Sequence, residues 1–90
     1  MRVDRIVHRP EFIKEFQALD QMVKRLVIKA VHTFHANPLY PSLRLHQLKG
    51  KLVGLWSLSL TSRVRIIFSR RNNGDIVFES VGFHDIYKCL

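Results

Sequence analysis

Residues 43–68 read LRLHQLKGKLVGLWSLSLTSRVRIIF, and this stretch decides the fold because it contains two consecutive segments of alternating hydrophobicity. In the first segment, Trp56, Leu58 and Leu60 share one face, whereas Ser57 and Ser59 share the other. A side-chain period of two is typical of a β-strand with one face in the core. After a tight connection at residues 61–62 the alternation resumes and continues to residue 68. The stretch therefore predicts a β-hairpin.

The two faces of this hairpin differ in chemistry. On the second strand, Val64, Ile66 and Phe68 share a face with the apolar residues of the first strand. Only one face of such a hairpin is expected to be core. We expect the opposite face to present polar side chains to solvent or to a ligand, namely Ser57, Ser59, Arg63 and Arg65.

The segments that flank the hairpin predict the remaining elements. Residues 71–75, RNNGD, are a turn signal because Asn and Gly tolerate positive φ, and a further strand is expected over residues 76–81. On the other side, residues 37–54 contain two prolines and two glycines, which predicts a loop with a brief helical turn near Leu43.

The first third of the chain predicts a strand and two helices. Residues 2–7 are partly β-branched and indicate an opening strand. Pro10 suits the first turn of a short helix, and Asp20 is a candidate N-cap for a longer one that ends at Asn37-Pro38. The order β-α-α-β-β-β predicts one α+β domain over residues 1–90, with both helices on one face of a mainly antiparallel four-stranded sheet.

Charge is the unusual feature of the composition. The chain has 90 residues and a formal net charge of +8. Asp20 and Asp75 bracket a stretch without any carboxylate, which contains ten basic residues: Lys24, Arg25, Lys29, Arg44, Lys49, Lys51, Arg63, Arg65, Arg70 and Arg71. Such a stretch predicts a surface that attracts polyanions, and binding through phosphates would be steeply salt-dependent. Solubilising charge is the simpler alternative.

Other classes of protein are disfavoured. The single cysteine, Cys89, has no partner for an internal disulfide, which favours a reducing cytoplasm. We find neither an export signal nor a membrane-spanning segment. His32 and His35 lie one helical turn apart, but no third ligand of suitable type is evident, so we expect no metal and no cofactor.

One set of residues fits metal-free RNA cleavage. That reaction needs a base for the 2′-OH, a cation for the charge on the phosphorane and an acid for the 5′ oxygen. We assign these tasks to His46, Arg65 and His84, because imidazole titrates near neutral pH and guanidinium is always charged. Four further residues are expected to bind flanking phosphates: Arg44, Lys49, Lys51 and Arg63.

Each of these residues also has a purely structural interpretation, which the sequence leaves open. His46 suits a solvated loop, and His84 suits a structural position. Trp56 shares a face with Leu58 and Leu60, which favours a place in the core over a role as a substrate platform. Arg63 and Arg65 would also serve simply to keep this face of the sheet soluble.

Several short motifs occur in a fixed order along the chain: Leu48-Lys49, Leu52-x-Gly54-x-Trp56-Ser57, Thr61, Arg65-Ile66-Ile67-Phe68 and the tail GFHDIY. In this ordered combination the sequence resembles the RelE/ParE superfamily of bacterial toxins from type II toxin–antitoxin systems. The YoeB and YafQ branches are the most similar, and the element order matches along nearly the whole chain. The resemblance implies the RelE-like microbial RNase fold and a ribosome-dependent mRNA endoribonuclease.

The resemblance also implies roles by position. His46 falls where YafQ-like toxins have a histidine and YoeB-like toxins a glutamate, Arg65 matches the phosphate-stabilising arginine, and His84 matches the acid/base histidine. Tyr87 matches the terminal aromatic that orients substrate, although its interval from His84 is one residue shorter than in YafQ. Ser57 and Ser59 occupy positions where RelE has catalytic lysines, which argues against a RelE-type lysine mechanism.

The implied partners are an antitoxin that covers Arg65 and His84, together with mRNA and ribosomal RNA; operator DNA would be met only through the antitoxin. Two other functions remain open within the same superfamily. One is a ParE-like inhibitor of DNA gyrase without nuclease chemistry, and the other is an inactive homologue that only binds its antitoxin.

Overall fold

The computed structural model describes residues 1–83. Along these residues the elements are β1 (Ile6–His8), α1 (Pro10–Gln17), α2 (Gln21–Ala36), the 3-10 turn η1 (Pro41–Leu43), β2 (His46–Gln47), the 3-10 turn η2 (Gly50–Leu52), β3 (Leu55–Ser59), β4 (Val64–Arg70) and β5 (Ile76–Phe83). The predicted α+β class and the order of the helices and longer strands are confirmed.

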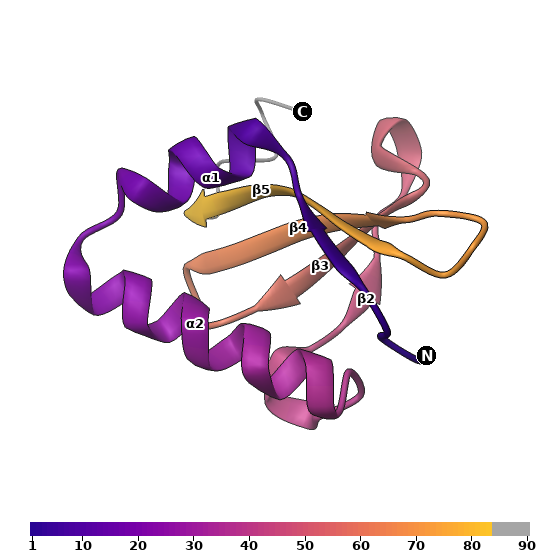
Figure 1. Ribbon diagram of the computed structural model, residues 1–90, viewed down its shortest axis with the longest axis horizontal. Helices are drawn as coiled ribbons and strands as arrows, with labels where there is room; N and C mark the ends of the chain where they lie inside the picture. The colour runs from indigo at the N-terminus through magenta and orange to yellow at the C-terminus, as the bar shows by residue number, and fades with distance from the viewer. Residues whose placement is uncertain (84–90) are drawn as a thin grey trace.

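The sheet has five strands in the order β1-β5-β4-β3-β2, where we predicted four (Figure 1). The additional strand is β2, which pairs antiparallel with β3 and places His46 opposite Ser57. Two residues without hydrophobic alternation give no strand signal, and β2 forms only because the chain returns beside β3. His46 therefore lies on an edge strand rather than on a loop. The opening strand is also shorter than predicted; it begins at Ile6 and pairs parallel with β5.

The local sequence signals predicted the positions of both helices correctly. Pro10 is the first residue of α1, and the side chain of Asp20 accepts a hydrogen bond of 2.9 Å from the backbone N–H of Val23 at the start of α2. This bond satisfies a donor that the first helical turn cannot satisfy itself. The helix ends at Asn37, as predicted. Within residues 1–83, neither helix is long and apolar enough to cross a membrane.

Both helices pack on the same face of the sheet, as predicted (Figure 1). The centre of this core is aromatic: the rings of Phe34 and Phe68 have centroids 5.2 Å apart, and those of Phe68 and Phe78 lie 6.5 Å apart. Trp56 stacks on Phe68 at 6.1 Å and packs against the same cluster. The core interpretation of Trp56 is therefore confirmed.

The opposite face of the sheet is less open than predicted. Ser57 is fully buried, Ser59 is only 7% exposed, and Ile67, which pairs with Ser57, is also fully buried. The expectation that the two serines are displayed on the surface was wrong. Alternation identifies a face but not what covers it: Ser57 lies between His46 of β2 and Ile67 of β4, and Ser59 lines a cavity together with Leu48 and Leu52 of the segment after β2.

A β-bulge changes the direction of β5. Ile67 pairs with Ser80 and Phe68 pairs with Phe78, so Glu79 is the additional residue. Beyond the bulge, Glu15 of α1 accepts a hydrogen bond of 2.8 Å from the Ser80 hydroxyl and one of 3.3 Å from the backbone N–H of Val81. The second half of β5 is thus attached to α1 rather than to β1.

We expect Asp20→Ala to destabilise the protein by about 1 kcal/mol, because it removes the N-cap of the longer helix. For a domain of this size, such a loss lowers the melting temperature by roughly 4–8 °C. The matched control is Asp4→Ala, which removes an exposed ion pair with Arg2 and should change the melting temperature little. Equal shifts for the two variants in thermal denaturation would contradict the capping role.

Candidate anion-binding site

A basic pocket with a volume of about 410 Å³ lies on the sheet face opposite the helices. Its lining comes from the segment around β2, the loop that follows it, and β3 and β4: Arg44, His46, Leu48, Lys49, Leu52, Ser59 and Arg65. No carboxylate is among these residues. We refer to this cavity as the basic pocket.

Strand register explains why His46 and Arg65, far apart in sequence, meet here. His46 pairs with Ser57, and Ser59 pairs with Arg65, and residues paired across strands point to the same face. The two side chains therefore stand on one face, two strand spacings apart, or roughly 10 Å. The side chains of His46 and Arg65 are long enough to contact, from opposite sides, a group that is bound between them.

The structure brings together four of the predicted site residues, Arg44, His46, Lys49 and Arg65. Lys51 on η2 and Arg63 before β4 do not line the pocket, and both are exposed. His84 and Tyr87 lie outside the described residues. The assignment of roles to all of these side chains remains a prediction.

The guanidinium of Arg65 is held by backbone carbonyls of the turn between β3 and β4. Nη1 donates to the carbonyls of Thr61 and Val64, and Nη2 donates at 3.1 Å to the carbonyl of Ser62. Within residues 1–83, no carboxylate forms an ion pair with Arg65. The group is thus positioned by neutral dipoles and keeps its full charge, which suits it to bind an anion.

His46 is oriented by its own backbone neighbourhood. Its Nδ1 lies 3.0 Å from the carbonyl oxygen of Arg44. Because a carbonyl oxygen only accepts hydrogen bonds, Nδ1 carries the proton, and the neutral ring then has its lone pair on Nε2. This is the arrangement that a general base requires. The carbonyl acceptor comes from a residue with left-handed backbone, since φ of Arg44 is +47°.

The carboxylates of the described chain are occupied elsewhere. The ion pairs among residues 1–83 all involve arginines of the N-terminal segment: Arg2–Asp4, Arg5–Asp75, Arg9–Glu11 and Arg9–Glu79. The acids of these residues therefore neutralise cations around β1 and β5, whereas the cations around β2 and β4 form no ion pair with a carboxylate of residues 1–83. This separation makes the basic pocket strongly electropositive.

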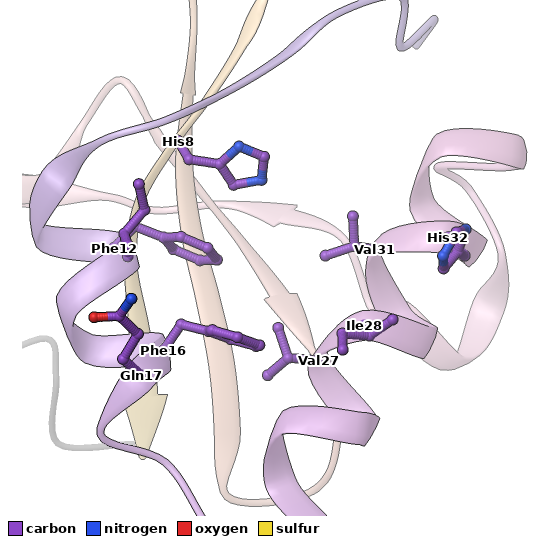
Figure 2. A pocket seen from close by; sticks show the side chains of 9 residues that line it. His8, Phe12, Phe16, Gln17, Val27, Ile28, Val31 and His32 are labelled. Atoms are coloured by element: carbon purple, nitrogen blue, oxygen red, sulfur yellow. The ribbon is translucent and has the colours of Figure 1, made fainter. Parts of the chain in front are cut away.

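A second cavity of about 400 Å³ lies between the helices and is largely apolar. Figure 2 shows Phe12 and Phe16 of α1 facing Val27 and Val31 of α2, with His8 near one end. Ile13 and Ile28, which also line this apolar groove, are 44% and 50% exposed. The groove has the character of a protein-binding surface rather than of a reaction centre. Within the described part of the chain, no group of three potential metal ligands is found.

Sequence reasoning missed two residues that line the basic pocket, Leu48 and Leu52, and did not foresee that the third, Ser59, would be enclosed. Leu48 and Leu52 form an apolar wall on the loop between β2 and β3, and Ser59 lies at the end of β3. The alternation did place Ser59 on the correct face. Nothing in the sequence indicated that a loop would cover that face and enclose the serine.

The fold and this site together define a class: a small α+β domain with a basic pocket on one face of its sheet, lined within residues 1–83 by no carboxylate, and two helices on the other face. No known family profile matches the sequence, and no curated protein matches it either. Similarity is found among solved structures. The chain has the fold of the YoeB, YafQ and RelE toxins, as the resemblance predicted.

Three solved structures illustrate the similarity. YafQ from E. coli strain BL21(DE3) superimposes with a TM-score of 0.76 at 17% identity, covering 93% of this chain and 98% of that one. The YoeB/ParE toxin from Agrobacterium tumefaciens gives 0.73 at 16% identity, with coverage of 90% and 99%. The toxin–antitoxin complex RelBE2 from Mycobacterium tuberculosis gives 0.74 at 15% identity, with coverage of 93% and 94%.

We expect Arg65→Gln to weaken binding of a single-stranded oligoribonucleotide by about 10-fold or more, because it removes a charge-assisted contact inside the pocket. The matched control is Arg63→Gln, which removes the same charge two residues away on the exposed surface and should cost about threefold or less. Fluorescence anisotropy at fixed salt measures both. Equal losses would indicate attraction by the overall charge rather than by the pocket.

Proposed function

We propose that this protein is the toxin of a type II toxin–antitoxin system and that it cuts mRNA on the ribosome. The observation that carries this proposal is an oriented imidazole, His46, on the wall of the same basic pocket as Arg65, an arginine without a carboxylate partner among residues 1–83. The fold shared with YoeB, YafQ and RelE toxins supports it.

The proposed reaction assigns one task to each of three residues. Nε2 of His46 removes the proton of a ribose 2′-OH, and the oxygen attacks the adjacent phosphorus. Arg65 stabilises the charge that develops on the phosphorane oxygens, because its guanidinium is held in place before the reaction begins. His84 protonates the departing 5′ oxygen. The products are a 2′,3′-cyclic phosphate and a 5′-hydroxyl, and each step is a proton transfer or a displacement at phosphorus.

Flanking phosphates are assigned to the surrounding cations. Arg44 and Lys49 line the pocket beside the reacting phosphate. Lys51 and Arg63 lie outside it, where they extend the electropositive surface along the RNA backbone. The basic residues of α2, among them Lys29, would face ribosomal RNA when the protein is bound to the ribosome.

We further propose an antitoxin partner. The RelBE2 structure is a toxin–antitoxin complex, and the present chain superimposes on it over 93% of its length. The chain offers such a partner two kinds of surface: the basic pocket, which suits acidic side chains, and the apolar groove between α1 and α2, which suits the apolar face of a helix.

We expect mRNA to be cut only during translation, and we expect His46→Ala and His84→Ala each to lower the cutting rate by about 100-fold or more, the usual range for loss of a general base or acid. Primer extension on a cellular mRNA after induced expression, with and without active translation, measures the cuts. Analysis of the new ends should find a 2′,3′-cyclic or 3′-phosphate and a 5′-hydroxyl.

The matched control is His35→Ala. It removes an exposed histidine at the end of α2 that does not line the basic pocket, and this variant should cut like the wild type. Intact mRNA on translating ribosomes would refute the nuclease proposal. Growth arrest without cuts, undiminished in the His46 and His84 variants, would instead support inhibition of DNA gyrase. No growth arrest from free protein would identify an inactive homologue.

We expect salt to weaken RNA binding more steeply than antitoxin binding. RNA is held mainly by phosphate contacts, which release counterions on binding, so added salt lowers the affinity for RNA steeply. An antitoxin also buries apolar surface in the groove, and salt does not screen that contribution. Affinities for both ligands between about 0.05 and 0.2 M salt give the two slopes. Equal slopes would contradict an apolar contribution to antitoxin binding.

A further inference from the structure

A smaller cavity of about 190 Å³ adjoins the basic pocket. Its lining is rich in hydroxyl groups: Ser42, Arg44, Ser59, Leu60, Thr61 and Ser62. Arg44 and Ser59 also line the basic pocket, so the two cavities meet at these side chains. We call the smaller one the hydroxyl cavity.

Ser59 is the unusual residue of this region. It is only 7% exposed, yet its hydroxyl has no hydrogen-bond partner within residues 1–83. Buried hydroxyls normally have a partner, since leaving one unpaired costs about 1–3 kcal/mol. No fully enclosed side-chain oxygen of the described chain is unpaired. The Ser59 oxygen must therefore reach the cavities that it lines, where a ligand can supply the missing hydrogen bond.

The turn between β3 and β4 fixes the hydroxyl cavity relative to Arg65. Thr61 Oγ1 accepts hydrogen bonds of 3.1 Å from the backbone N–H groups of Arg63 and Val64, which closes the turn. The carbonyls of Thr61 and Ser62 in the same turn hold the guanidinium of Arg65. One hydrogen-bonded turn thus positions both the group proposed to bind the reacting phosphate and the wall of the neighbouring cavity.

We propose that the hydroxyl cavity is a subsite for the nucleotide next to the cut, an inference that rests on the function proposed above. Hydroxyl groups both donate and accept, which matches the 2′-OH and the edge of an unstacked base. Leu60 and the guanidinium of Arg44 supply surfaces for the face of the base. The volume is below the roughly 300–1,000 Å³ of pockets for larger ligands, so it accommodates part of a single nucleotide.

The test is binding of two ligands to the purified protein: a ribonucleoside 3′-monophosphate, which fills the basic pocket alone, and a dinucleotide that is made uncleavable by a 2′-deoxy group at the nucleotide whose 2′-OH would attack. We expect the wild type to bind the dinucleotide more tightly. Ser59→Ala should weaken dinucleotide binding by about 3- to 10-fold, the value of one hydrogen bond, and should weaken it more than mononucleotide binding, since Ser59 lines both cavities.

A second variant keeps the test independent of Ser59. Ser42 lies on the exposed rim of the hydroxyl cavity and does not line the basic pocket. Ser42→Leu, which fills the hydroxyl cavity, should therefore weaken dinucleotide binding and leave mononucleotide binding unchanged. The control is Ser69→Ala on β4, whose hydroxyl binds Glu79 away from both cavities and should affect neither ligand. Melting temperatures check that each variant is folded.

Binding and cleavage are read separately. Equal affinity of the wild type for the two ligands, or unchanged dinucleotide binding in both Ser59→Ala and Ser42→Leu, overturns the subsite even if the wild type cuts mRNA. Absence of ribosome-dependent cutting refutes the nuclease function, and the binding comparison then still decides whether the cavity accepts a second nucleotide.

Discussion

The position of β3 between β2 and β4 is the constraint on which the rest of the site depends. The register on one side places His46 opposite Ser57, and on the other side it places Arg65 opposite Ser59. A slip of one residue in either pairing would move the affected side chain to the helix-covered face. Register, rather than any contact between His46 and Arg65, therefore determines that they share a pocket.

That register is held by the aromatic core on the other face. Phe68 lies opposite Trp56 and stacks on it, and it also contacts Phe34 of α2 and Phe78 of β5. Moving β4 by one residue would turn Phe68 out of this cluster and lose several kcal/mol of buried surface and packing. The two faces of the sheet thus have different roles. Packing on the apolar face sets the strand register, and this register places His46 and Arg65 together on the opposite face.

Charge is separated in the same manner. The described acids pair with arginines of the N-terminal segment or bind backbone and hydroxyl groups, as Glu15 does with Ser80 and Val81. No carboxylate of the described acids pairs with the pocket cations, and Arg65 is held by carbonyl groups that orient it without neutralising it. Mutual repulsion of these cations is a cost to the free protein, which an anionic ligand or an acidic partner would relieve.

The sequence by itself determined what depends on neighbours along the chain. Asp20 caps its helix, Asn37-Pro38 ends it, alternation over residues 55–68 makes a hairpin, and the absence of acids between Asp20 and Asp75 makes one region basic. Tertiary structure decided what depends on residues distant in sequence. Strand β2 exists only beside β3, Ser59 becomes enclosed only among residues distant from it in sequence, and the basic pocket closes only when the loop after β2 returns over the sheet. Local hydrogen bonds and hydrophobic periods depend on a few adjacent residues, so the sequence shows them directly. Strand pairing and the enclosure of a pocket depend on contact between segments that are distant in the sequence.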